Sequence, residues 1–397
     1  MSETCWVVLP TGRQRSGAWI DDTLAERVRE RGLEAKLPLA GDFPRQRVEV
    51  VRGADTFAVI NDLFYRRGWT DGLPIVPPTT GRVEAMIRHA PAPASHVVGV
   101  LDPLKGEASM EKIAANAVMA GCRPDYLPVV VAAVEAILEP AFNLRGVQTT
   151  DENVTPLVVV SGPVAEALDI NGGFGALGPG WRANATIGRA LRLVMNNIGG
   201  GWPMVVSFAG IAQPGRYTLC LAENTAASPW PALHVEEGFD ASASTVTLAR
   251  AECAITVTGG LAELASVMGS AASAFSVLHG GRVAVILAPA VAQELAAEGW
   301  SKDDVKRHLH EQGRIATTAW KQSWLYERMI EPERWPDWVR NAADSGAIPA
   351  VRAPDDITVV VAGGDIPIPQ NVYFPSWGFP PCRVTKEIRL TPGWEAQ

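Results

Sequence analysis

Short apolar runs bounded by turn residues place the strongest limit on how this chain can fold. Three of these runs, TPLVVVSG, RVAVILAP and ITVVVAGG, are almost continuously apolar and rich in Val and Ile. A strand that is buried on both faces has this pattern, whereas a half-exposed strand alternates apolar and polar residues. Because helical patterns lie between the runs, the sequence predicts an α/β fold with mixed sheets flanked by helices.

The expected elements follow from the spacing of the apolar residues. Strands are expected in the Val/Ile-rich runs between turn residues, at residues 6–10, 97–101, 155–162, 204–210, 217–224, 244–258, 282–289 and 357–364. Helices are expected where apolar residues recur every three or four positions, at residues 21–31, 56–66, 81–89, 109–121, 127–138, 183–198, 261–277, 291–298, 301–312 and 317–343.

The length of the chain favours two domains. Its 397 residues exceed the size at which single hydrophobic cores usually stop growing. A charged stretch at 45–52 and a Ser/Ala-rich stretch at 241–244 mark the candidate boundaries. The predicted division is a small strand-helix segment at 1–53, a first α/β region at 54–240 and a second α/β region at 241–397.

Composition excludes several classes of function. The net charge is −8 and no Lys/Arg cluster is present, which argues against nucleic acid as a partner. The chain has neither a run of about 20 apolar residues nor a signal peptide, so we expect no membrane span and a cytoplasmic location. Five dispersed cysteines without a C-x-x-C pair predict reduced thiols. Because metal and nucleotide motifs are also missing, no cofactor is predicted.

A glycine-rich stretch at 170–180 precedes the helix expected at 183–198. Three of its glycines match G-x-G-x-x-G, but GPVAEALDIN separates them from the preceding strand, which argues against a dinucleotide site. Clustered glycines let backbone N–H groups approach a ligand closely, and a helix N-terminus favours an anion. We therefore expect Gly178 and Gly180 to contact an anionic substrate.

The helix that follows the glycines carries arginines on one side. At about 100° per residue, Arg182, Arg189, Arg192 and Asn196 lie within one arc, and apolar residues occupy the opposite side. This pattern predicts binding of a carboxylate or a phosphate. A buried structural arginine network and a plain solvated face remain open as alternatives.

The stretch CLAENTAASPWPALHVEEGF at 220–239 gathers side chains that can perform chemistry. It follows an expected strand and contains two prolines, so we expect an ordered loop. The imidazole of His234 can exchange a proton near neutral pH, and a carboxylate such as Glu223 would orient it. A histidine bonded only to backbone is the structural alternative.

Two further residues are candidates for catalysis. Cys122 stands between two expected helices, and the N-terminus of the second would stabilise a thiolate while the C-terminus of the first would oppose it. The cysteine is thus either a nucleophile or an inert buried thiol. Asp71 belongs to a tight Asp-Gly turn and is either an acid/base group or a turn former.

Five segments together resemble a bacterial family related to the UGSC (seleno)proteins: GWTDGLPIVPPT, NAVMAGCRPDYLPVV, GPGWRANATIGRALRL, ENTAASPWPALHVEEGF and GWSKDDV. The resemblance covers roughly residues 54–390. A Sec/Cys-Gly-Ser-Cys element is associated with the family and implies thiol or selenol redox work. This chain contains no C-G-S-C, and its first 50 or so residues look like a reduced remnant. The resemblance therefore does not imply a self-contained redox mechanism.

The sequence predicts a cofactor-independent enzyme of the lyase or hydrolase type that acts on a small carboxylate- or phosphate-bearing substrate. The predicted catalytic residues are His234, Glu223, Cys122 and Asp71, and the predicted substrate contacts are Arg182, Asn184, Thr186, Arg189, Arg192, Asn196, Asn224, Ser228, Gly178 and Gly180. The prediction requires the arginines to face the same hollow as the histidine. A thiol-dependent oxidoreductase with a separate redox partner protein and a non-catalytic ligand-binding protein are the alternatives, and a homo-oligomer stays open.

Overall fold

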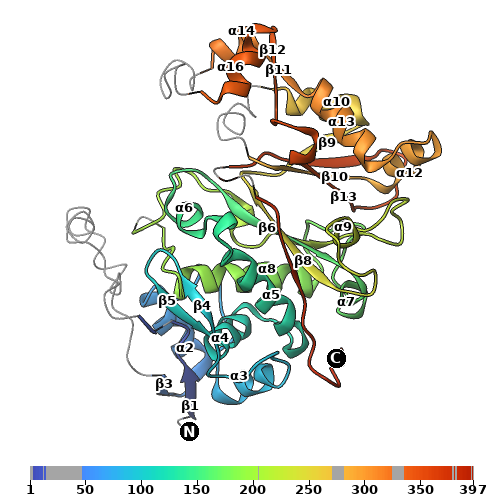
Figure 1. The fold of residues 1–397 in the computed structure, drawn as a ribbon. Coiled ribbons are helices and arrows are strands. Elements are labelled where there is room, and N and C mark those ends of the chain that lie inside the picture. The colour runs from blue at the N-terminus through green and yellow to red at the C-terminus, as the bar shows by residue number, and fades with distance from the viewer. Residues whose placement is uncertain are drawn as a thin grey trace.

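Two four-stranded mixed sheets with helices on their outer sides form the centre of the protein (Figure 1). The computed structural model describes residues 3–11, 13–14, 47–203, 205–270, 281–323, 335–377, 380, 382–394 and 396. Both sheets contain parallel and antiparallel pairs. The predicted α/β class with mixed sheets and flanking helices is therefore confirmed.

The first sheet runs through the middle of the chain and returns at its end. Its strands, in spatial order, are β15 (Val384–Glu387), β8 (Thr245–Ala251), β6 (Thr155–Ser161) and β7 (Cys220–Ala222). Strand β6 is parallel to β7 and antiparallel to β8. Strands from both sides of the predicted domain boundary at 241 thus share one sheet, so that boundary does not separate the two sheets.

The second sheet lies wholly in the C-terminal part of the chain. Its strands, in spatial order, are β13 (Ile357–Val361), β10 (Val283–Leu287), β14 (Gln370–Phe374) and β9 (Ile255–Thr258). Strands β10 and β13 are parallel, and every residue of both is buried. The run at 244–258, which the sequence predicts as one strand, divides into β8 and β9 in different sheets.

Alternate side chains show how the two sheets are covered. On β6, Val158 and Val160 belong to the core beneath the helices, whereas Leu157 and Val159 pack in a cluster that also contains Ile286 of β10. The two sheets therefore pack against each other through their inner faces, and each has helices on its outer face. This burial on both faces explains why the strand runs are continuously apolar.

Helices of different regions cover the two sheets. The first sheet is covered by α5 (Leu127–Ile137) and α8 (Arg182–Asn197), and α4 (Met110–Ala120) packs against both helices. The second is covered by α10 (Leu261–Met268), α12 (Pro289–Ala297) and α13 (Lys302–Gln312). The remaining elements are α2 (Thr56–Arg66), α3 (Thr80–Ile87), α6 (Leu144–Thr149), α7 (Pro163–Ala167), α9 (Leu233–Glu236), α14 (Thr317–Lys321), α16 (Asp337–Asp344), β1 (Glu3–Val8), β2 (Arg13–Gln14), β3 (Val48–Gly53), β4 (Val97–Leu101), β5 (Gly106–Ser109), β11 (Arg314–Ala316) and β12 (Ala347–Pro349).

Local capping fixes where several helices begin and end. The side chain of Ser109 accepts a hydrogen bond from the backbone N–H of Lys112 at the start of α4, and Gly121 ends that helix at a φ of 93°. At α13, Ser301 and Asp304 form a reciprocal capping box. These contacts satisfy backbone groups that a helix terminus leaves unpaired, which is why the boundaries fall at these residues.

Some of the predicted elements are absent from the structure or lie outside the described residues. Residue 204 lies outside the described residues, and the rest of the strand expected at 204–210 does not form: Ser207 makes only an isolated bridge, with Pro203. The helix expected at 21–31 lies outside the described residues, and those expected at 261–277 and 317–343 lie partly outside them. Within the described part of the chain, no single helix is long and apolar enough to span a membrane; the bent pair Pro124–Ile137 and Pro140–Thr149 passes that test by length and composition only.

Candidate functional site

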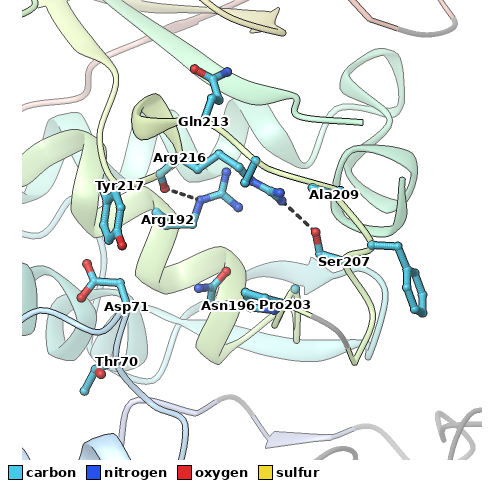
Figure 2. A pocket seen from close by; sticks show the side chains of 14 residues that line it. Thr70, Asp71, Arg192, Asn196, Pro203, Ser207, Ala209, Gln213, Arg216 and Tyr217 are labelled. Atoms are coloured by element: carbon cyan, nitrogen blue, oxygen red, sulfur yellow. Dashed lines mark hydrogen bonds between the residues drawn. The ribbon is translucent and has the colours of Figure 1, made fainter. Parts of the chain in front are cut away.

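The C-terminal half of α8 and the irregular loop at 201–217 enclose a cavity of about 510 Å³, which we call the arginine cavity (Figure 2). Its lining residues come from α8, from this loop and from the turn after α2. They are Thr70, Asp71, Arg192, Asn196, Gly201, Pro203, Ser207, Phe208, Ala209, Gly210, Ala212, Gln213, Arg216 and Tyr217. Its volume is in the usual range for small-molecule sites.

Arg192 is the more deeply buried of the two arginines that line the arginine cavity, with 7% of its surface exposed. Its Nε donates to the backbone oxygen of Arg216 at 2.9 Å, and its Nη2 donates to Thr155 Oγ1 at 3.1 Å. Among the described residues, no carboxylate forms an ion pair with this guanidinium, and its Nη1 has no hydrogen-bond partner. Burial, and then the positive charge of Arg216, lower the pKa of Arg192 to about 9.

Arg216 brings a second guanidinium to the same side of the cavity, as Figure 2 shows. Its Nη2 donates to Ser207 Oγ at 2.9 Å. Burial lowers the pKa of Arg216, and the nearby charge of Glu252 raises it to a smaller degree. Two positive charges thus lie in one partly buried cavity, and neither forms an ion pair in the part of the chain that the structure describes.

Neutral groups complete the polar side of the cavity. The Oδ1 atom of Asn196 is buried and has no hydrogen-bond partner within the described chain. Gln213 anchors the loop, since its Nε2 donates to the backbone oxygens of Asn153, Ala251 and Glu252 at 3.3, 3.1 and 2.7 Å. The loop wall is therefore held in place by hydrogen bonds although it contains almost no regular structure.

Asp71 lines the arginine cavity, but its carboxylate is already paired. Arg189 grips it in a bidentate manner, with Nε to Oδ2 at 2.6 Å and Nη2 to Oδ1 at 2.8 Å. Oδ1 also accepts the backbone N–H of Leu73 at 3.2 Å, which closes the turn that the Asp-Gly pair predicts. The turn-forming alternative for Asp71 is therefore the one that the geometry favours.

The predicted arginine face is divided among different surroundings. Arg182 is exposed at the first residue of α8, and its carbonyl accepts the hydroxyl of Thr186 at 2.8 Å. Arg189 is committed to Asp71, so only Arg192 and Asn196 of this face line the arginine cavity. A rise of about 1.5 Å per residue separates Arg182 from Arg192 by roughly 15 Å, too far for one small ligand to bridge.

A second cavity of about 710 Å³, the His234 cavity, lies at the carboxyl ends of the parallel strands β6 and β7. Glu223, Asn224 and His234 all line it, as do Gly172 and Gly173 of the glycine-rich stretch. This edge of a parallel sheet is a common ligand site in α/β proteins. Three of the loop residues that the sequence singled out thus line one cavity, although not beside the arginines.

The carboxylate of Glu223 is occupied by structural contacts. It accepts the hydroxyl of Ser161 at 2.7 Å and the backbone N–H of Leu233 at 2.8 Å. The ammonium of Lys302 lies 3.6 Å from its other oxygen, and Glu236 shares that ammonium at 2.9 Å. These contacts fix the start of α9 to the end of β6, so Glu223 has little capacity left for proton transfer.

His234 is buried beside the same cavity without a link to Glu223. Only 2% of its surface is exposed, its Nε2 lies 3.4 Å from the backbone oxygen of Ala241, and its Nδ1 is enclosed with no partner among the described residues. Asn224 accepts the backbone N–H of Ala227 and Ser228 bonds to Trp230, both of which are loop contacts. The structural alternative fits these residues better than the catalytic one.

The two cavities do not merge, which corrects a central expectation. Within the described ranges, no residue lines both the arginine cavity and the His234 cavity. The expectation failed because Arg192 lies in the C-terminal half of α8, beside the loop at 201–217. His234 instead lies in α9 and shares its cavity with the glycine-rich stretch. The arginines and the imidazole therefore do not face one hollow.

A third cavity of about 560 Å³ adjoins the N-terminal end of α8 and includes Gly178 and Asn184 in its lining. The amide of Asn184 is saturated by backbone contacts: its Oδ1 accepts from Asn171 at 2.8 Å, and its Nδ2 donates to the oxygens of Asn171 and Ala176 at 2.8 and 3.1 Å. Asn184 thus pins the glycine-rich stretch to α8. Gly180 adopts a φ of 128°, a conformation that favours glycine.

Cys122 is a partly buried thiol held in a hydrogen bond. Its Sγ donates to the backbone oxygen of Thr186 at 3.3 Å, and burial raises the pKa of this thiol to about 12. Since the thiolate is the nucleophilic form, this environment opposes the predicted nucleophilic role.

Most of the lining of the arginine cavity was not predicted from the sequence, including the polar residues Ser207, Arg216 and Tyr217. They lie in the loop at 201–217, part of which the sequence pattern predicts as a strand. The segment QPGRY offered the one usable signal, because a turn that contains Pro and Gly commonly presents neighbouring side chains in a loop.

The fold and the cavity together define a mixed α/β protein with a cavity that carries two arginines, neither of which has a carboxylate partner among the residues that the structure describes. No protein-family model matches the chain, and no curated protein matches it either. The resemblance to the UGSC-related family stays a prediction. In the regions that the structure describes, no group of three or more His, Cys, Asp or Glu side chains is arranged to hold a metal ion.

Proposed function

We propose that the protein recognises a small organic anion, whose carboxylate or phosphate group binds between Arg192 and Arg216 in the arginine cavity. The observation that carries the proposal is the guanidinium of Arg192, which is almost fully buried and has no counterion among the described residues. A buried charge without a counterion costs folding free energy. An anionic ligand would supply the missing counterion and offset that cost, so its binding is favoured.

The donors around the cavity suit an anionic oxygen. Among the described residues, Arg192 Nη1 has no hydrogen-bond partner, and the guanidinium of Arg216 makes one hydrogen bond, to Ser207. Guanidinium groups bind carboxylates and phosphates through paired, charge-assisted hydrogen bonds. We infer that the anion receives hydrogen bonds from both arginines and that the hydroxyl of Ser207 lies close enough to contribute.

This proposal retains one part of the function predicted from sequence and leaves another without support. Anion recognition by Arg192 and Asn196 is retained. Acid/base catalysis by Glu223 and His234 has no support at this anion, because both residues line another cavity. The proposed function is therefore anion recognition, and the lyase or hydrolase chemistry remains a prediction from the sequence.

Calorimetric titration with benzoate and with phosphate tests the proposal. We expect wild-type protein to bind at least one of them, and Arg192→Met to weaken that binding by about 10-fold to 100-fold, the effect of losing charge-assisted hydrogen bonds. Arg182→Met is the matched control, since Arg182 is exposed on the same helix and should leave the affinity unchanged. Equal affinities in the two variants would contradict the proposal.

A further inference from the structure

The walls of the arginine cavity differ sharply in character. Its two guanidinium groups lie close together, between Tyr217 and Ser207 in Figure 2. The rest of the lining includes the apolar side chains of Pro203, Phe208, Ala209 and Ala212 together with the ring of Tyr217. A ligand that consists only of an anionic group would leave these apolar surfaces in contact with water.

The apolar lining residues, which we call the apolar wall, include two aromatic side chains that a ligand can reach. Phe208 and Tyr217 both line the cavity, and they keep 38% and 48% of their surface exposed. Large apolar side chains on a folded protein are usually better covered, and exposed aromatic groups around a cavity are typical of ligand sites. The two residues would lose exposed surface on binding a ligand with an apolar body.

The position on α8 favours a single negative charge over a double one. Arg192 and Asn196 lie in the last two turns of this helix, towards the end at which the helix dipole is negative. The carboxylate of Asp71 also lines the cavity, although Arg189 compensates it. Both features oppose a phosphate dianion more than they oppose a carboxylate.

We propose that the ligand of the arginine cavity is an amphipathic monocarboxylate, with its carboxylate on Arg192 and Arg216 and its apolar body against Tyr217 and the loop at 201–217. This inference rests on the proposed function, because it assumes that the two arginines bind the anion. It adds the chemical class of the ligand. The cavity holds about 510 Å³, which is enough for a chain or ring beyond the carboxylate.

A series of linear carboxylates from acetate to hexanoate tests this inference. We expect the affinity of wild-type protein to rise by about fourfold for each added methylene, which corresponds to the burial of about 0.8 kcal/mol per CH₂. Dissociation constants are measured by calorimetry, with the weak members followed by displacement of hexanoate. Inorganic phosphate, measured in the same buffer, should bind more weakly than hexanoate.

Two matched variants locate the apolar contact. Tyr217→Ser removes the aromatic wall and should reduce the gain per methylene without abolishing acetate binding. Tyr65→Ser is the control, because Tyr65 is 64% exposed on α2 and does not line the cavity. If a variant folds poorly, the carboxylate series measured on wild-type protein still tests the inference.

The outcomes separate this inference from the proposed function. If all carboxylates bind with the same affinity and Arg192→Met weakens each of them, the apolar contact is refuted and anion recognition stands. Tighter binding of phosphate than of hexanoate also refutes the monocarboxylate class. If no anion binds in a manner that depends on Arg192, the inference fails together with the function on which it rests.

Discussion

Replacement of Arg216 by glutamine separates a ligand-binding arginine from a structural one. The backbone oxygen of Arg216 still accepts the hydrogen bond from Arg192 in this variant, and the shorter glutamine side chain weakens only the contact to Ser207. The change thus removes one positive charge and few contacts. We expect carboxylate affinity to fall by about 10-fold to 100-fold, since a hydrogen bond to a charged group contributes about 1.5 to 3 kcal/mol.

The stability of the unliganded protein should respond quite differently. Burial of Arg216 beside Arg192 is unfavourable, and both guanidinium pKa values are lowered. Loss of one charge relieves this repulsion and offsets the weaker contact to Ser207. We therefore expect the free energy of unfolding to change by no more than about 1 kcal/mol, whereas breaking a buried ion pair costs about 3 to 5 kcal/mol.

Arg189→Gln is the matched counterpart on the same helix. It breaks the bidentate pair with Asp71, whose side chain is 4% exposed, and should destabilise the protein by about 3 to 5 kcal/mol. Its carboxylate affinity should fall less than that of Arg216→Gln, because Arg189 does not line the cavity and acts on the ligand only through the charge of Asp71 that it compensates. Urea denaturation and calorimetry measure the two quantities. A large loss of stability in Arg216→Gln with unchanged affinity would refute this reasoning.

Three further predictions concern buried groups outside the two arginines. Burial, and then the charge of Glu152, raise the pKa of Glu252 from 4.5 to about 7. The folded state therefore binds this proton more tightly than the unfolded state, and the free energy of unfolding falls as the pH rises between these values. Glu252→Gln should raise the free energy of unfolding at pH 8 by up to about 3 kcal/mol and change it little at pH 4.5. Asn184→Ala should destabilise the protein by about 3 kcal/mol, since several backbone groups lose their partner. Cys122 should react with iodoacetamide at pH 8 far more slowly in folded than in urea-unfolded protein, because burial raises its pKa to about 12.

Simple controls accompany these measurements. Glu298→Gln and Asn341→Ala change exposed residues of the same types and should leave urea midpoints unaltered at every pH. An equal benefit of Glu252→Gln at pH 4.5 and pH 8 would contradict the assigned titration. Mass spectrometry follows the alkylation of Cys122, and rapid labelling of the folded protein would show that the thiol is not buried as described.

The fold was accessible from the sequence wherever one local pattern decides the structure. The helix predicted at 56–66 and the strand predicted at 97–101 agree with α2 and β4 residue for residue. The continuous apolar runs correctly indicate strands buried on both faces. The order of strands was not accessible, since β15 joins β8 across more than a hundred residues and no local pattern specifies that pairing.

The site was only partly accessible for the same reason. Arg192 and Asn196 were predicted because helical periodicity places them on one face, and both line the arginine cavity. Their partner Arg216 lies in a loop held by three hydrogen bonds from Gln213 to distant backbone oxygens, which no spacing rule anticipates. Arg189 was misplaced because periodicity gives the direction of a side chain and not the carboxylate, here Asp71, that captures it.

A crystal structure of the protein soaked with 4-bromobenzoate tests anion recognition most directly, because the anomalous signal of bromine marks both the position and the orientation of the ligand. We predict the carboxylate oxygens within hydrogen-bonding distance of Arg192 and Arg216, with the bromine directed towards the apolar wall that contains Tyr217. Bromine density in the His234 cavity alone, or no density in the arginine cavity at a saturating concentration, would contradict the account.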